Sequence, residues 1–509
     1  MRPSGKSFDM AVFTSRGDRV PARQLSDAMV VDLECMPPFE HSPETADGRA
    51  TLPAPDGAFG VCIPLTVEGF GHVSIHADNG GNGYRAAEVA GRTLNFSLEA
   101  AESRAAAVSA AEQRFSAMGS EFSSEYGERM SKARELLEGA RAKKSDEVAC
   151  AKLAMASLAE SLHAGEMLVV EHARCRIAAS PTRTGFLFGC NGFGYPKLGE
   201  KYAELFGHLL NFATLPFYRA GTEAEEGARD FSKVEKILEW TTRDGIGVKG
   251  HPLVWFHQAG IPKWLAGRTY EQVEATHRDY IMDAVGRFGD RIKIWDVINE
   301  AHDWANDFDY TPEQLVEMTR LACDVTREAD PDATRIVNSC CTWSEYVAKG
   351  KNYSRDINRP ARSVFQYLRD LMGAGVDFEI IGVQMYYPVR DLFEIDRQLD
   401  RFCQLGKPVH ITELGVSSSV APVEHNPIVD IHHRRYWHGK PWSEREQADW
   451  VESYYTMCYA KPAIEAMTWW DFSDPAFIPH GGLVDENLRP KEAYHRLKGL
   501  IGGWQARPG

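Results

Sequence analysis

The chain has few of the features that would place it in a membrane or on nucleic acid. None of its 509 residues belong to a run of about 18 apolar residues, and no apolar stretch follows basic residues near the start. Basic residues number 57 against 72 acidic ones, which gives a formal net charge of -15. Since nucleic acids and anionic membranes bind cationic surfaces, we expect neither as a partner.

Paired cysteines are also lacking. The ten cysteines are scattered along the chain without disulfide or C-x-x-C metal spacing. We therefore predict reduced thiols and no metal, which favours a cytoplasmic protein. A secreted protein whose signal peptide has been trimmed would look the same.

The length exceeds what one hydrophobic core can serve, so several domains are expected. Residues 1–85 are rich in proline and glycine, and Val61, Ile63, Leu65 and Val67 alternate with other residues, which predicts a small β-sandwich-like accessory domain. This domain could bind sugar or act as a spacer. Residues 86–178 are rich in alanine, glutamate and arginine, which predicts an α-helical region, a hairpin of long helices that packs within the chain.

Residues 179–509 alternate short apolar runs with helical patterns. Eight such runs are typical of a (β/α)8 TIM barrel, and no G-x-G-x-x-G follows a strand to support an open doubly wound sheet. The predicted strands are Phe186–Cys190, Leu210–Pro216, Gly247–Trp255, Ile292–Asn299, Arg335–Ser339, Ile380–Tyr386, Val409–Glu413 and Ala466–Asp471.

Two glutamates, Glu300 in "IKIWDVINEA" and Glu413 in "KPVHITELGV", stand where such apolar runs stop. A single glutamate at such a position is more often a salt-bridged structural residue. Two of them at the ends of parallel strands place two carboxylates at one mouth of the barrel. Paired carboxylates predict an acid and a nucleophile for cleavage of a glycosidic bond.

The other predicted strand ends carry aromatic, histidine and amide side chains, as in "GHPLVWFHQ", "GVQMYY" and "TWWDFSD". Sugar rings stack on aromatic faces, and their hydroxyls need donors and acceptors of this kind. The segments "KGHPLVW", "WDVINEA", "GVQ", "ITEL" and "RPKEAY", in this order, resemble family 10 glycoside hydrolases, the β-1,4-xylanase family.

The resemblance implies a retaining hydrolase without a cofactor, acting on xylan or xylooligosaccharides. Glu300 would be the general acid/base and stay protonated, whereas Glu413 would be the ionised nucleophile. Asn299 would bind the sugar 2-hydroxyl. Further substrate-binding positions matched to the family are His251, Trp255, Gln258, Gln384 and Trp470, and Asn338 matches an asparagine that helps to hold the acid/base region.

The chain departs from the family at several positions. Tyr386 stands where members carry a histidine that hydrogen-bonds the nucleophile, and we expect its phenol to reach Glu413. The second strand has Thr214, Leu215 and Tyr218 near positions that are usually glutamate, asparagine and lysine, which predicts a more apolar surface. The same mechanism on another β-linked glycan, or a carbohydrate-binding protein without turnover, therefore stays open. The oligomeric state is not predicted.

Overall fold

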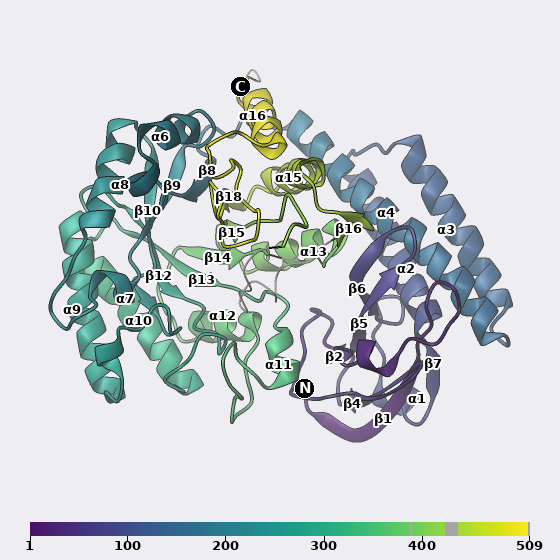
Figure 1. The fold of residues 1–509 in the computed structure, drawn as a ribbon. Helices are drawn as coiled ribbons and strands as arrows, with labels where there is room; N and C mark the ends of the chain where they lie inside the picture. Colours follow the sequence, from purple (N-terminus) through teal and green to yellow (C-terminus); the bar gives the residue numbers. More distant parts are fainter. Residues whose placement is uncertain (387–388, 423–435, 507–509) are drawn as a thin grey trace.

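The computed structural model describes residues 1–386, 389–422 and 436–506. Its centre is a closed barrel of parallel strands with helices outside (Figure 1). The strands are β8 (Leu187–Asn191), β9 (Phe212–Pro216), β10 (Gly247–His251) with its extension β11 (Val254–Trp255), β12 (Ile294–Asn299), β13 (Thr334–Ser339), β14 (Ile380–Gln384), β15 (Val409–Leu414) and β18 (Ile464–Trp469).

Closure of the barrel is visible in the strand pairing. β18 pairs with β8 in parallel, and β10 pairs with β12 as well as with β9. Each strand interior is buried nearly throughout, as expected for parallel strands covered by side chains inside the barrel and by helices outside. The predicted TIM barrel is confirmed.

Helices cover the barrel from outside. Three of them begin with a capping box, in which a threonine or serine and a glutamine three residues later satisfy the first backbone donors. The helices are α5 (Tyr195–Leu198), α6 (Glu200–Gly207), α7 (Arg219–Thr222), α8 (Ser232–Arg243), α9 (Tyr270–Phe288), α10 (Pro312–Ala329), α11 (Glu345–Lys349), α12 (Val364–Gly373), α13 (Leu392–Cys403), α15 (Glu444–Tyr459) and α16 (Glu492–Gln505). A short hairpin, β16 (Tyr436–Trp437) and β17 (Lys440–Pro441), precedes α15.

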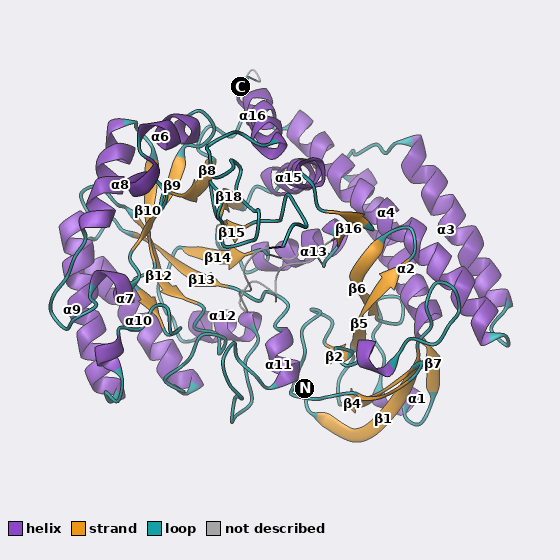
Figure 2. Ribbon diagram, viewed as in Figure 1, coloured by secondary structure: helices purple, strands orange, loops and turns teal. Residues whose placement is uncertain are grey.

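The N-terminal residues form two sheets beside the barrel (Figure 2). One sheet has the order β3 (Glu44–Ala46), β4 (Arg49–Pro55), β1 (Pro3–Ala11), β7 (Thr93–Asn95), and the other has β2 (Met29–Val31), β5 (Gly60–Val67), β6 (Gly71–Ala77). The alternating residues Val61, Ile63, Leu65 and Val67 all point into a core shared by both sheets.

Long helices follow these sheets. After α1 (Ala86–Val89) and β7 come α2 (Phe96–Ala117), α3 (Ser124–Ala142) and α4 (Glu147–Ala179). α4 is long and apolar enough by length and composition to cross a bilayer, but 67% of its most apolar window is buried in the protein. Because α4 packs along α2 and α3, this composition is that of a core helix.

The N-terminal part and the barrel share a tight interface. The Arg104 guanidinium of α2 lies 2.5 Å from Asp391 and 3.3 Å from Glu394, and all three side chains are buried. Gly350, with φ +60°, lets Glu40 approach the end of α11 so closely that a Cβ there would lie 2.3 Å from its carboxyl carbon. The two parts therefore pack closely against each other, through buried ion pairs and a close approach at Gly350.

Candidate active site

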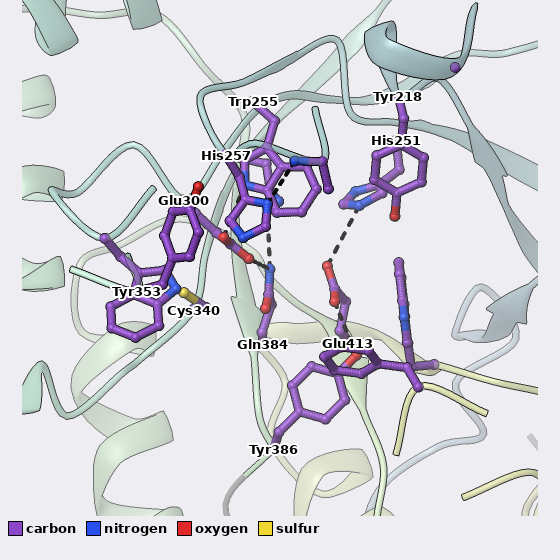
Figure 3. A pocket seen from close by; sticks show the side chains of 16 residues that line it. Tyr218, His251, Trp255, His257, Glu300, Cys340, Tyr353, Gln384, Tyr386 and Glu413 are labelled. Atoms are coloured by element: carbon purple, nitrogen blue, oxygen red, sulfur yellow. Dashed lines mark hydrogen bonds and ion pairs between the residues drawn. The ribbon is translucent and has the colours of Figure 1, made fainter. Parts of the chain in front are cut away.

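A cavity of about 530 Å³ opens at the carboxyl ends of the barrel strands (Figure 3). Its size is that of a small-molecule binding site. The side chains and backbone lining it come from Tyr218, Gly221, His251, Trp255, His257, Ala259, Asn299, Glu300, Trp304, Cys340, Tyr353, Gln384, Tyr386, Glu413, Trp470 and Phe477.

Glu413 enters the cavity from β15. Tyr386 donates its hydroxyl proton to Oε2 of Glu413 at 3.0 Å, and Asn338 donates Nδ2–H to Oε1 at 3.3 Å. Nε2 of His251 lies 3.7 Å from the same Oε1. The tyrosine in place of the family histidine therefore reaches the carboxylate, as expected.

Glu300 follows β12 directly and has the left-handed backbone value φ +57°. This conformation is uncommon for a side chain of this kind and is held by a hydrogen bond from the Glu300 N–H to the Asn338 carbonyl at 2.9 Å. Trp255 donates its indole N–H to Oε2 at 3.0 Å, and Gln384 donates Nε2–H to Oε1 at 2.8 Å. The turn and these two donors fix the direction of the carboxyl group.

Asn338 joins the two halves of the site. Its Nδ2 donates to Oδ1 of Asn299 at 2.8 Å as well as to Glu413, and its own Oδ1 accepts the Thr412 hydroxyl at 2.5 Å. Because one amide contacts both Asn299 and Glu413, Asn338 on β13 fixes the side chains at the ends of β12 and β15 relative to each other.

Asp296 and Lys249 fix the orientation of the His251 ring. Its Nδ1 lies 2.6 Å from Asp296, and Lys249 lies 2.7 Å from the same carboxylate oxygen. Burial opposes ionisation of Asp296, but the Lys249 charge and the His251 contact hold its pKa below the ordinary value. Burial lowers the pKa of His251, so a neutral ring donates Nδ1–H to Asp296 and turns Nε2 toward the cavity.

Both glutamates of the cavity are difficult to ionise. Burial raises the pKa of Glu300, and burial together with the Glu300 charge raises the pKa of Glu413 well above its ordinary value. The expectation from sequence was a protonated Glu300 beside an ionised Glu413. The structure differs in that both pKa values are raised, and the Lys249 charge and the Tyr386 hydrogen bond are the main influences that favour charge on Glu413.

Most of the residues singled out from sequence meet in this cavity. They are His251, Trp255, Asn299, Glu300, Gln384, Tyr386, Glu413 and Trp470, and Tyr218 joins them. Gln258 does not line it: the His257 ring stacks on Trp255 at 4.4 Å and takes that place, while Gln258 is exposed. Thr214 and Leu215 are buried and line no part of the cavity, so Leu215 supplies no stacking surface.

Sequence reasoning missed several lining residues. Trp304 lies four residues after Glu300 and could have been found from its position in the loop that follows the acid. His257 stands in the segment "GHPLVWFHQ", beside the Gln258 that was chosen instead. Cys340 and Tyr353 carry no local signal, because the loops that contain them have no regular pattern.

One cluster elsewhere has metal-ligand side chains close together. Donor atoms of Cys35, His76 and Glu394 lie within 4.8 Å of one another. Positive charges surround it: Arg401 contacts the Cys35 sulfur at 3.5 Å and Arg390 contacts the His76 ring at 2.8 Å. Burial opposes ionisation of Cys35, yet His76 and Arg401 bring its pKa down to about 7. The arginines supply the compensating charge that a cation would bring, so this donor set does not fit a metal.

The match to a known family begins just after the altered second strand. The model of glycosyl hydrolase family 10 matches residues 219–499, more than half of the chain. The chain belongs to glycosyl hydrolase family 10. As a member of this family, the protein is a glycoside hydrolase.

Relatives of this family-10 chain include two bacterial enzymes. Endo-1,4-beta-xylanase B of Thermotoga neapolitana is 28% identical over 342 residues, which cover 62% of this chain and 88% of that protein. Beta-1,4-xylanase of Dictyoglomus thermophilum is 25% identical over 290 residues, 53% of this chain and 75% of that protein. Among solved structures, native xylanase 10B from Thermotoga maritima is 26% identical with a TM-score of 0.49, and the alignment covers 66% of this chain and 98% of that one.

Proposed function

We propose that this family-10 protein hydrolyses β-1,4-xylosidic bonds in xylan or xylooligosaccharides with retention of configuration. The observation that carries this proposal is the arrangement of Glu300 and Glu413, two buried carboxyl groups from different strands on one cavity, each with its own hydrogen-bond donors. The two relatives named above are both xylanases, which supports xylan as the substrate.

In the first step Glu300 gives its proton to the glycosidic oxygen while Glu413 attacks the anomeric carbon, so the leaving sugar departs and a covalent glycosyl ester forms. In the second step Glu300 takes a proton from water, which attacks the same carbon and releases Glu413. The raised pKa of Glu300 suits the acid, and the Tyr386 hydroxyl stabilises the charge that Glu413 carries before attack.

Asn299 and Trp470 position the reacting sugar. Asn299 lines the cavity next to Glu300. Its Oδ1 accepts from Asn338 and Gln384, so its amide N–H groups are directed toward Glu300 and the sugar 2-hydroxyl. The Trp470 ring lies 5.3 Å from the His251 ring in an edge-to-face arrangement and offers its face to a sugar ring.

The test is a panel of β-linked polysaccharides, namely xylan, β-glucan and mannan, with products separated by chromatography and the first-formed anomer read by NMR. We expect xylooligosaccharides from xylan, with the β-anomer formed first. Faster release from β-glucan or mannan would move the activity to the alternative, another β-linked glycan, and the α-anomer first would exclude double displacement. Binding of xylooligosaccharides without release of reducing ends at any pH would favour a carbohydrate-binding protein.

A further inference from the structure

A second cavity, of about 340 Å³, lies between the N-terminal sheet and the barrel. We call it the interdomain chamber. It shares three aromatic wall residues, Trp304, Tyr353 and Tyr386, with the active-site cavity, so the two spaces adjoin. The remaining wall is made by the N-terminal Asp27, Met29, Pro64, His72 and Ser74 and by the barrel residues Cys341, Glu345, Tyr346, Lys349, Lys351, Asn352, Val389 and Arg390.

The N-terminal wall is the outer face of the sheet β2-β5-β6. In β5 and β6 the alternate residues Ile63 and Ile75 point into the N-terminal core, whereas Pro64 and Ser74, which pair across the strands, point to the chamber. The Ser74 N–H donates to the Val389 carbonyl of the barrel at 3.0 Å. This wall is therefore joined to the barrel through a backbone hydrogen bond at its edge.

The same face packs on the barrel through a small apolar cluster. Met29, Val31 and Cys62 contact Ala348 of α11. Because its walls belong to strands and a helix that pack on each other, the chamber has its shape before any ligand binds.

The chamber adjoins the active site through Tyr353 on the Glu300 side and through Tyr386, which contacts Glu413. In Figure 3, Tyr353 and Cys340 lie toward Glu300, whereas His251 and Tyr218 lie toward Glu413. Cys340 lines the active-site cavity together with Glu300, and its neighbour Cys341 lines the chamber. Since the acid protonates the oxygen of the departing sugar, the leaving part of the substrate extends toward this side.

The chemistry of the walls favours uncharged sugar. Trp304 and Tyr353 offer aromatic faces, and His72 and Asn352 add polar groups. Each lysine and arginine in the described part of the wall pairs with a carboxylate: Lys349 with Asp27 at 3.1 Å, Lys351 with Asp356 at 3.2 Å, and Arg390 with Glu345 at 2.6 Å. Among the described wall residues, therefore, every lysine and arginine already has a carboxylate partner, which favours a neutral ligand over an acidic one.

We propose that the interdomain chamber binds the leaving-group end of the substrate, namely neutral sugar rings beyond the one next to the cleaved bond. The N-terminal domain is then part of the substrate cleft and selects for the length of the leaving group. This inference rests on the proposed xylan hydrolysis, whose substrate it specifies further.

The test fills the chamber and compares two substrates. Pro64→Trp places a large ring on its N-terminal wall, and Thr45→Trp, on the exposed strand β3 outside the chamber, is the matched control. Xylohexaose needs room for a long leaving group, whereas nitrophenyl xylobioside releases only nitrophenol. For Pro64→Trp we expect kcat/KM to fall about tenfold or more on xylohexaose and to change less than about twofold on the aryl substrate, because stacking contacts of the leaving chain are lost.

The rates on the two substrates decide whether the chamber binds the leaving group. Selective loss on xylohexaose in Pro64→Trp, with Thr45→Trp like the parent, supports the proposal. No change on xylohexaose, or an equal loss on both substrates, overturns it. If the parent cleaves the aryl substrate but not xylohexaose, this inference fails while glycoside hydrolysis stands; if the parent cleaves neither, the proposed function fails as well. Should Pro64→Trp not fold, His72→Trp carries the same test from β6.

Discussion

The two carboxyl groups of the active site share their degree of burial but not their surroundings. Glu300 accepts from an indole and an amide, Trp255 and Gln384, whereas Glu413 accepts from the Tyr386 phenol and has Lys249 among the charges acting on it. Burial raises the pKa of both groups, and the Glu300 charge raises that of Glu413 further, so the neighbouring donors and charges decide which group holds the proton. Substitutions at Glu413, Glu300, Tyr386 and Trp255 each change one of these two surroundings.

The largest effect is expected from removal of the proposed nucleophile. In Glu413→Ala no covalent intermediate can form, and kcat on xylooligosaccharides should fall by about 10⁴ or more. Glu465→Gln, an exposed glutamate on β18, is the control and should keep parental activity. A Glu413→Ala variant as fast as the parent would rule out this assignment.

The loss of activity on removal of the proposed acid should depend on the leaving group of the substrate. In Glu300→Gln the proton for a sugar leaving group is lost, so we expect kcat/KM on xylooligosaccharides to fall by about 10²–10⁴. A dinitrophenyl glycoside needs no such proton, and its first step should change little. Steady-state and burst kinetics on the two substrates measure the difference; equal losses on both would contradict an acid role for Glu300.

Tyr386→Phe should change the pH profile as well as the rate. The phenol hydrogen bond lowers the pKa of Glu413, so its loss raises that pKa further, and the ionised nucleophile is lost at a higher pH as the solution is acidified. The acid limb of the plot of kcat/KM against pH should therefore move to higher pH. A hydrogen bond to a charged group contributes about 1.5–3 kcal/mol, so kcat/KM at neutral pH should fall roughly tenfold to a hundredfold. An unmoved acid limb would argue against the contact.

The smallest effect is expected at Trp255. Its indole hydrogen bond lowers the pKa of Glu300, so Trp255→Phe raises that pKa, and the acid keeps its proton to a higher pH. The alkaline limb should move upward by less than about one pH unit, since one unit corresponds to 1.36 kcal/mol. The ring still packs beside His257, so folding should be unaffected, which a thermal melt checks. A downward shift would reverse the assigned role of this bond.

The barrel and its two glutamates were predictable because their signals are local. Apolar runs mark buried strands, and a glutamate at the end of such a run stands out. Gln258 and Leu215 were misplaced because a shift of one residue turns a side chain from the cavity to solvent or to the core, and motif spacing does not resolve that step.

The raised pKa of both carboxyl groups and the interdomain chamber had no such signal. The pKa values depend on how deeply the two groups are buried and on how close they come, which are properties of the folded cavity. The chamber needs residues as distant in sequence as Pro64 and Asn352 to face each other. The residue pattern within either segment does not show that the two segments come together in the fold.

The Arg104 side chain has a consequence for any attempt to shorten the protein. With the first 178 residues removed, Asp391 would lose the Arg104 guanidinium that lies 2.5 Å away, and the faces of α13 and α15 that pack on α4 would lose their partner. A barrel cut from this chain without residues 1–178 should therefore be less stable than the same barrel in the whole protein. The N-terminal third is a structural partner of the barrel, and the two parts should be expressed and engineered together.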